Sequence, residues 1–188
     1  GYNLRVSLAF NIFIKGKTVS LRPLILDDLK GNYKYWLNDP DVVKHSSHGK
    51  FPFSENILRE YILRSTNNDS KIVLAIIDLK TSKHIGNISL QSINWIDRNC
   101  EIAFLLGDKD FWSNGIMYES GKLLIKHAFE QLNLHRIYCA TSLNNIGMQK
   151  LAIKLDMKQE GVRKESIYNE GKYFDIIEYG LINKYEIL

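Results

Sequence analysis

Short stretches in which apolar and polar residues alternate recur along the chain, and this is the pattern of half-buried strands. The pattern predicts strands over residues 18–22, 71–79, 84–95 and 100–106. Only short polar turns, at 80–83 and 97–99, separate the last three strands. We therefore expect these three strands to pair as an antiparallel meander, because short turns join antiparallel neighbours.

Apolar residues at helical spacing predict four helices. They cover residues 27–37, 54–62, 116–132 and 144–155. Ser54 suits the N-cap of the second helix, because its hydroxyl accepts a hydrogen bond from a first-turn N–H group. Asp27 and Asp28 suit the first turn of the first helix, where the helix dipole favours negative charge.

The second half of the chain changes the order of elements. A helix between strands 100–106 and 136–141 makes these two strands parallel, because a helical crossover returns the chain in the same direction. Residues 157–168 and 172–183 read as a closing hairpin around a turn at 169–171. The pattern thus predicts an α/β fold with flanking helices and a mixed, mostly antiparallel sheet of about seven strands.

One domain accounts for residues 16–188, since no internal repeat, low-complexity tract or linker interrupts them. Residues 1–15 form an N-terminal extension. Its role stays open between an added strand, a dimer contact and a remnant of expression. A homodimer is accordingly one of the open assemblies.

Composition narrows the class of protein. The chain has 188 residues, 45% of them hydrophobic and 24% charged, which is ordinary for a globular domain. The net charge of +4 comes from scattered basic residues, so we expect no nucleic-acid partner. No apolar run approaches the ~20 residues that span a bilayer, and residues 4–14 lack the features of a signal peptide. These observations predict a cytoplasmic protein without a membrane partner.

Two cysteines and five histidines are the candidate metal ligands. Cys100 and Cys139 lie in apolar segments and are expected to be reduced core residues. The histidines show no metal-ligand spacing, so the sequence predicts no metal site.

The stretch from Cys100 to Ser120 suggests an anion site. Its alternating strand ends at Gly107, a polar loop follows, and Gly115 opens the next helix. A helix N-terminus presents free N–H groups and the positive end of the helix dipole, and both favour a phosphate. We expect a pyrophosphate-bearing ligand there, although many strand-to-helix turns contain glycine and bind nothing.

A series of short motifs accompanies this order of elements. They are L-R-P-L at 21–24 with Asp27, W-L-N-D-P at 36–40, I-G-N-I at 85–88, E-I-A-F at 101–104, Trp112 with Gly115 and Glu119, A-F at 128–129, L-N-L at 132–134, Asn145, and E-G at 160–161. Their number, order and spacing resemble the GNAT acyltransferase family, and more closely its branch that acetylates ribosomal-protein alanine N-termini. The resemblance covers roughly residues 16–183.

The resemblance implies a GNAT fold that binds acetyl-CoA between two splayed parallel strands. Backbone groups on the first strand then hold the pantetheine arm, and they belong to Phe104, Leu105 and Leu106. The loop that opens the following helix wraps the pyrophosphate, and it consists of Trp112, Ser113, Asn114, Gly115, Ile116 and Met117. Asn145, before the next helix, bonds the pantetheine.

The implied reaction is direct attack of a primary amine on the thioester, with N–H groups around Leu105 and Leu106 polarising its carbonyl. Glu101 is then the candidate general base, because burial against an apolar wall raises a carboxyl pKa toward the useful range. An alternative of equal weight is a strand-edge glutamate paired with a neighbour such as Arg98.

Two residues are candidates for the acceptor pocket. His45 lies in a loop that the resemblance places over this pocket, although a solvated loop histidine is the commoner case. Trp95, at a strand end beside a polar turn, is the candidate for an aromatic wall. Trp36 is expected in the core, given its helical spacing with Tyr33 and Leu37.

Several positions depart from the family pattern. Relatives favour a glycine at Ser113, a basic residue at Asn114 and a small residue at Met117. They often carry hydroxyl side chains at or near Met148 and Ala152, where a general acid would stand. Tyr118, Tyr138 and Ser142 are substitutes without a specific spacing argument. Glu119 opposes a phosphate in sign and is expected to stabilise the first turn of its helix.

Two functions follow from these observations. The first is an N-acetyltransferase acting on an amino sugar, polyamine or similar small amine, or on a protein N-terminus. The sequence leans toward a small amine, because no acidic patch suggests docking on a basic ribosomal protein. The second is a catalytically weak or inactive GNAT domain that binds CoA or serves as an interaction module.

Overall fold

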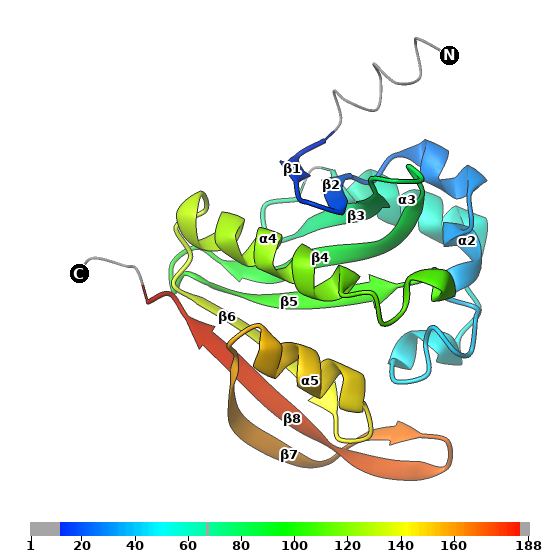
Figure 1. Ribbon diagram of the computed structural model, residues 1–188. Helices are drawn as coiled ribbons and strands as arrows, with labels where there is room; N and C mark the ends of the chain where they lie inside the picture. The colour runs from blue at the N-terminus through cyan, green and yellow to red at the C-terminus, as the bar shows by residue number, and fades with distance from the viewer. Residues whose placement is uncertain (1–11, 67, 185–188) are drawn as a thin grey trace.

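The computed structural model describes residues 12–66 and 68–184 (Figure 1). These residues form one sheet of eight strands in the order β1-β2-β3-β4-β5-β6-β8-β7. They are β1 (Ile14–Lys15), β2 (Val19–Pro23), β3 (Ile72–Asp78), β4 (His84–Asn94), β5 (Asn99–Leu106), β6 (Arg136–Ser142), β7 (Lys158–Asn169) and β8 (Lys172–Ile182). The predicted mixed sheet is confirmed, and β1 adds a strand to the expected set. Of the N-terminal extension, residues 1–11 lie outside the described residues.

Within the described part of the chain, seven helical segments flank the sheet. They are η1 (Leu26–Lys30), α2 (Tyr33–Trp36), η2 (Ser47–Lys50), α3 (Glu55–Ser65), η3 (Lys109–Phe111), α4 (Ile116–Glu130) and α5 (Ile146–Lys154). The predicted single helix over 27–37 is wrong, since a 3-10 turn and one short α-helix occupy that range. The Ser54 N-cap is confirmed, because its hydroxyl accepts a hydrogen bond from the Ile57 N–H group at 3.3 Å.

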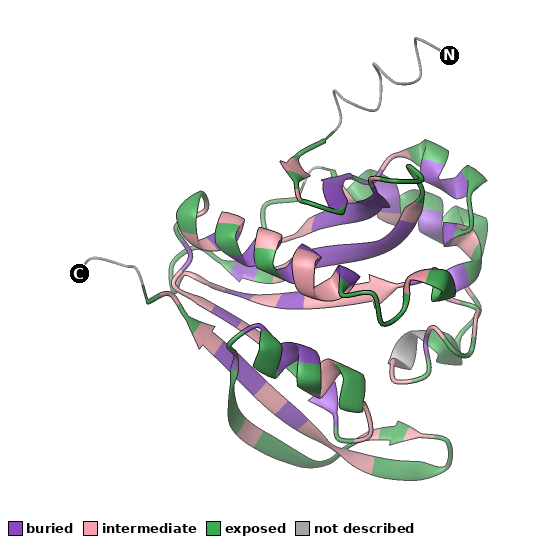
Figure 2. Ribbon diagram, viewed as in Figure 1, coloured by how far each residue is buried: buried purple, intermediate pink, exposed green. Residues whose placement is uncertain are grey.

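Helices cover both faces of the sheet and define two cores (Figures 1 and 2). α4 and α5 pack on one face, termed the α4 face, and residues such as Cys100, Ile102 and Leu124 are buried there. η1, α2 and α3 pack on the other, termed the α3 face, against Val73 and Ala75 of β3. Cys100 and Cys139 are buried free cysteines, as the sequence predicted.

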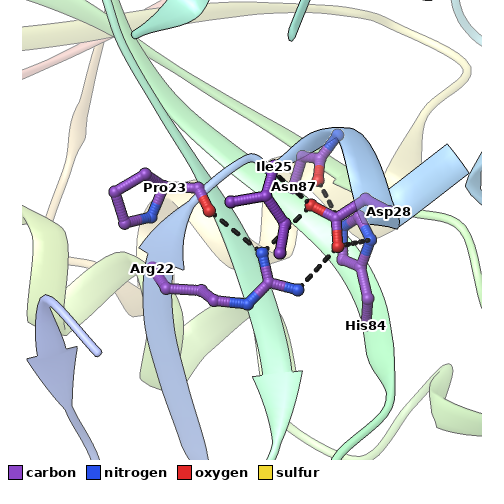
Figure 3. Close-up of polar contacts among 6 residues, drawn as sticks. All are labelled: Arg22, Pro23, Ile25, Asp28, His84 and Asn87. Carbon is purple, nitrogen blue, oxygen red and sulfur yellow. Dashed lines mark hydrogen bonds and ion pairs between the residues drawn. The ribbon is translucent and has the colours of Figure 1, made fainter. Parts of the chain in front are cut away.

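A buried ion pair holds the start of the domain together (Figure 3). Arg22 and Asp28 form two hydrogen bonds of 2.6 and 3.0 Å, and both side chains are almost fully buried. Asp28 also accepts the Ile25 N–H group at 2.9 Å. His84 lies beside the pair and bonds Asn87 at 2.7 Å. Asp28 thus lies in the first turn of η1, as the sequence suggested, and it binds the Arg22 guanidinium as well as the N-cap N–H group.

Candidate active site at the β5–β6 splay

β5 and β6 are paired at one end only. Their parallel register covers three positions, and Glu101 opposite Tyr138 is the last of them. Beyond this point β5 stays paired with β4 as far as Leu106, while β6 stays paired with β8 as far as Ser142. The two strands thus diverge into a gap with unpaired backbone edges, which we term the splay. Such edges need hydrogen-bonding partners.

Alternation along β5 decides which backbone groups face the splay. The N–H group of Gly107 bonds the carbonyl of Ile85 on β4, at 3.1 Å. Because strand residues alternate in direction, Leu105 also faces β4, whereas Phe104 and Leu106 face the splay. The expectation that the N–H group of Leu105 serves the ligand is therefore corrected, and Phe104 and Leu106 remain.

The loop after β5 folds back onto the splay. The Trp112 indole donates a hydrogen bond from Nε1 to the carbonyl of Leu106 at 2.9 Å, so one splay-facing carbonyl is already satisfied. Trp36 packs directly over Gly107, where an added Cβ would lie 1.9 Å from the indole. Trp36 is buried, as the sequence predicted.

The N-terminus of α4 stands at the open end of the splay. Gly115 is its N-cap, with φ of +74°, and Ser113 also has a positive φ of +67°. The N–H groups of residues 116–118 come before the first intrahelical bond, which runs from Glu119 to Gly115. They are therefore available to an anion. Trp112, Ser113 and Asn114 are exposed beside them.

Asn145 caps the N-terminus of α5. Its side-chain oxygen accepts the Met148 N–H group at 3.1 Å, which is an N-cap. The predicted bond to pantetheine therefore has to come from its Nδ2 group. Ala152, on the same helix, is fully buried and carries no hydroxyl.

Glu101 lies at the root of the splay, on the α3 face, because its neighbours Cys100 and Ile102 point into the α4-face core. Burial raises the pKa of its carboxyl, and the positive charge of Arg163 opposes this shift. The carboxylate forms no ion pair among the described residues, whereas Arg98 donates to the carbonyl of Asn133 at 2.8 Å. The geometry thus favours the base over the paired alternative.

Tyr138, which the sequence offered only as one of three substitute acids without a spacing argument, is a neighbour of Glu101. It lies directly opposite Glu101 in the β5–β6 register and on the same face. Burial and the Glu101 charge both raise the pKa of its hydroxyl. Register across strands that are 37 positions apart is not visible in local patterns, so only the fold brings the two together.

The structure separates the two acceptor candidates. His45 reaches the Asn144 side chain beside the end of β6, and its Nδ1 atom is buried without a partner among the described residues. Burial lowers the pKa of this imidazole. Trp95 instead lies in the β4–β5 turn, at the end of β5 away from the splay opening, and donates to the Asp69 carbonyl at 2.7 Å. Trp95 is therefore removed from the candidate site.

Other site types were sought among residues 12–66 and 68–184. No group of three or more His, Cys, Asp or Glu side chains in this range is placed to hold a metal ion. None of the helices formed by these residues has both the length and the apolar composition to cross a bilayer.

A parallel strand pair that splays beside a helix N-terminus is the arrangement that the resemblance to the acyltransferase family implies for acetyl-CoA binding. The family model of the acetyltransferase (GNAT) domain matches residues 18–158. The chain therefore belongs to the GNAT acetyltransferase family, whose members are acetyl-CoA-dependent acyltransferases. The resemblance inferred from the motifs is confirmed.

Curated relatives are similar along most of their length. The Bacillus subtilis protein named Probable N-acetyltransferase YjcK is 25% identical over 177 residues, covering 90% of this chain and 97% of its own. N-acetyltransferase p20 of Bacillus licheniformis is 26% identical over 170 residues, covering 88% and 93%.

Solved structures share the fold. RimL, a ribosomal alpha-N-protein acetyltransferase in complex with coenzyme A, superposes with a TM-score of 0.82 at 20% identity, covering 91% of this chain and 97% of that chain. Spermidine N-acetyltransferase from Vibrio cholerae, in complex with CoA and spermine, superposes with a TM-score of 0.79 at 21% identity, covering 89% and 96%.

Proposed function

We propose that this chain transfers the acetyl group of acetyl-CoA directly to a primary amine, with the cofactor arm lying in the splay. The observation that supports this most is the end of β5–β6 pairing at Glu101 and Tyr138, next to a helix N-terminus. An extended arm that contains amides satisfies unpaired strand edges as an added strand does.

In this proposal, each part of the cofactor binds a different set of backbone N–H groups. The N–H groups of residues 116–118 take the pyrophosphate, since they begin a helix of 15 residues. Leu106 donates its N–H group to a pantetheine amide. Phe104 lies nearer Glu101 along the strand, so its N–H group is the donor for the thioester carbonyl as negative charge develops on the oxygen.

Glu101 is the proposed general base. Its ionised carboxylate takes a proton from the acceptor nitrogen, which attacks the carbonyl carbon as the C–S bond breaks. The thiolate of CoA departs and is then protonated. A thiol pKa near the ~8.5 of free cysteine makes this leaving group tolerable without a dedicated acid. That fits a site without hydroxyls at Met148 and Ala152.

The acceptor is proposed to be a small amine. Structural relatives named for spermidine and for a ribosomal protein N-terminus support an amine of either kind. His45, which reaches Asn144 at the open end of the splay, is the proposed contact with the body of the acceptor.

A CoA-binding module without catalysis is the second candidate. The half-buried side chain of Met117 packs against the α4-face core in the first turn of α4, where relatives favour a small residue. Neither Ser113 nor Asn114 supplies a cation to the pyrophosphate.

A thermal-shift titration with acetyl-CoA, followed by thiol release over a panel of amines, tests both candidates. The proposed enzyme is stabilised by acetyl-CoA and releases thiol with at least one amine. Stabilisation without thiol release would favour the binding module. An unchanged melting temperature at millimolar acetyl-CoA would contradict both the enzyme and the CoA-binding module.

A further inference from the structure

A loop from the α3 face bridges to the β7–β8 hairpin. Lys50 donates from Nζ to the carbonyl of Tyr168 at 2.5 Å, and its ammonium lies 5.3 Å from the Tyr168 ring centroid. Asn169 donates from Nδ2 to the carbonyl of Lys44 at 2.6 Å. These partners are 118 and 125 positions apart in the sequence. The contacts join the segment between α2 and α3 to the tip of the hairpin.

The start of the same loop is tied to the end of β5. Lys109, in η3, forms ion pairs with Asp39 at 2.9 Å and with Asp41 at 2.8 Å. η3 follows β5 directly, so these ion pairs fix the loop to the other wall of the splay. Both ends of the loop segment 39–50 are therefore anchored, one on each side of the gap.

Strand pairing completes a ring. Ser142, the last residue of β6, is opposite Ile176 of β8, so the hairpin tip extends beyond the end of β6. The ring runs from β5 through η3, the loop 39–50 and the hairpin to β6, and β6 rejoins β5 at Glu101 and Tyr138. It surrounds the open end of the splay on the α3 face, opposite α4 and α5.

The carboxylates along this ring are largely neutralised. Asp39 and Asp41 share Lys109, and Asp175 pairs with Lys164 at 3.1 Å. On the adjoining sheet face, two further glutamates pair with arginines on other strands of the β6-β8-β7 part of the sheet. These pairs are Glu178 with Arg163 at 2.7 Å and Glu160 with Arg136 at 2.5 Å.

Few negative charges are left for an acceptor. Glu101 is half-buried, and its carboxylate forms neither an ion pair nor a side-chain hydrogen bond among the described residues. Asp108 is half-buried too, but its carboxylate caps η3 by accepting the Asp110 N–H group at 3.0 Å. Asp110, Glu165 and Glu170 are exposed, so solvent screens their charges. The site therefore offers one enclosed carboxylate, which matches one ammonium group, and a second ammonium beside it would be desolvated without a counter-charge.

We propose that the acceptor is a compact amine with a single positive charge, which enters through this ring to reach Glu101. The proposal rests on the proposed acetyl transfer and specifies its substrate class. The site has no second enclosed carboxylate to pair with the second charge of a polycation. The N-terminus of a folded protein could reach Glu101 only if the ring opened.

Three acceptors of equal length test the charge requirement on the full chain. They are 6-aminohexan-1-ol, 1,6-diaminohexane and 6-aminohexanoic acid, which differ only in the group at the far end. We expect kcat/KM for the amino alcohol to exceed that for the diamine by about tenfold at fixed ionic strength. The reason is that the second ammonium of the diamine is desolvated without a carboxylate to pair with it. A diamine used equally well or better would overturn the proposal.

Opening the ring tests the size requirement. The double variant Lys50→Ala with Asn169→Ala removes both hydrogen bonds. Lys71→Ala is the matched control, because the Lys71 ammonium lies over the Tyr61 ring, away from the ring of contacts around the splay. We expect the double variant to gain several-fold in kcat/KM on a folded-protein N-terminus relative to 6-aminohexan-1-ol, with an unchanged KM for acetyl-CoA. An unchanged ratio, or a wild-type chain that already prefers the protein, would overturn the proposal.

A binding measurement separates failure of this proposal from failure of the proposed function. Calorimetry with the CoA complex ranks the three acceptors without turnover. If no amine is acetylated but the amino alcohol binds about tenfold more tightly than the diamine, acetyl transfer fails and the acceptor class stands. If acetyl transfer occurs and the diamine binds more tightly, the acceptor class fails and acetyl transfer stands.

Discussion

The carboxylate of Glu119, in the first turn of α4, accepts a hydrogen bond from the hydroxyl of Thr18 at 2.7 Å. The same carboxylate accepts the backbone N–H groups of residues 17–19 at 2.9 to 3.2 Å. These residues lie in the turn between β1 and β2 and at the first position of β2. Glu119 therefore ties the N-terminal strands to the helix that holds the proposed pyrophosphate site, a role beyond the first-turn stabilisation expected from sequence.

Glu119→Ala is expected to lower the free energy of unfolding by about 2 kcal/mol, because charge-assisted hydrogen bonds to backbone donors are lost. For a domain of this size we expect a fall in Tm of about 4–8 °C. Glu130→Ala, in the last turn of the same helix, is the control. Equal melting temperatures for the two variants would contradict this role.

Glu101→Gln is expected to lower kcat by about 10²–10⁴-fold, the usual contribution of a general base. Because the pKa of Glu101 is raised, wild-type activity falls as the pH drops through that pKa, and the variant loses this limb of its pH profile. The raised pKa also means that the folded chain favours the neutral carboxyl. The Glu101→Gln variant should therefore be at least as stable as wild type at pH 7. Glu130→Gln is the control for activity and should keep the full rate. A variant with wild-type rate and pH profile would end the base assignment.

Trp112→Phe removes the indole hydrogen bond to the Leu106 carbonyl beside the splay. A net loss of about 1 kcal/mol per hydrogen bond predicts a rise of about fivefold in KM for acetyl-CoA. Trp95→Phe removes a matched indole bond, to the Asp69 carbonyl, away from the splay opening. It should leave this KM unchanged, and a similar rise in both variants would refute a local effect.

Gly107→Ala places a methyl group against the buried ring of Trp36, 1.9 Å from its nearest carbon. Overpacking of this kind costs about 1–3 kcal/mol, so chemical denaturation should show a lower free energy of unfolding. Gly31→Ala is the control, since its added Cβ meets only the Asp28 carbonyl at 3.7 Å. The contact is refuted if the two variants unfold at the same denaturant concentration.

His84 should make stability depend on pH. Burial lowers the pKa of its imidazole despite the nearby Asp28, so the unfolded chain binds the proton first as the pH falls. The stability linked to His84 is therefore complete above the unfolded pKa of about 6.5 and is lost as the pH falls below it, at about 1.4 kcal/mol per unit of pKa difference.

His84→Gln should flatten this dependence when Tm is recorded between pH 5 and 8. His45 and His127 also have pKa values lowered chiefly by burial, and they contribute with the same sign in both proteins. The difference between wild type and variant thus isolates His84. Parallel Tm curves for the two proteins would contradict the assignment.

Much of the fold could be predicted from the sequence, because it depends on local pattern. The alternation of Ile102 and Phe104 with Ala103 and Leu105 predicts a strand, and Gly115 marks the start of a helix, whatever surrounds them. Meander, crossover and hairpin follow from connection lengths. The motifs were sufficient to identify the family. They also predicted that Glu101 lies on a strand and that residues 112–117 lead into the following helix.

Contacts between distant segments were decided by the tertiary structure. Which N–H groups face the splay depends on the register of β5 against β4. In this register Leu105 faces β4, whereas Phe104 and Leu106 face the splay. Glu119 reads as a helix-dipole residue, yet its carboxylate binds residues 17–19, which only folding brings near. The ring closed by Lys50 and Asn169 joins residues more than a hundred positions apart. Periodicity records which face of an element is buried, but it carries no record of the partner against which that face packs.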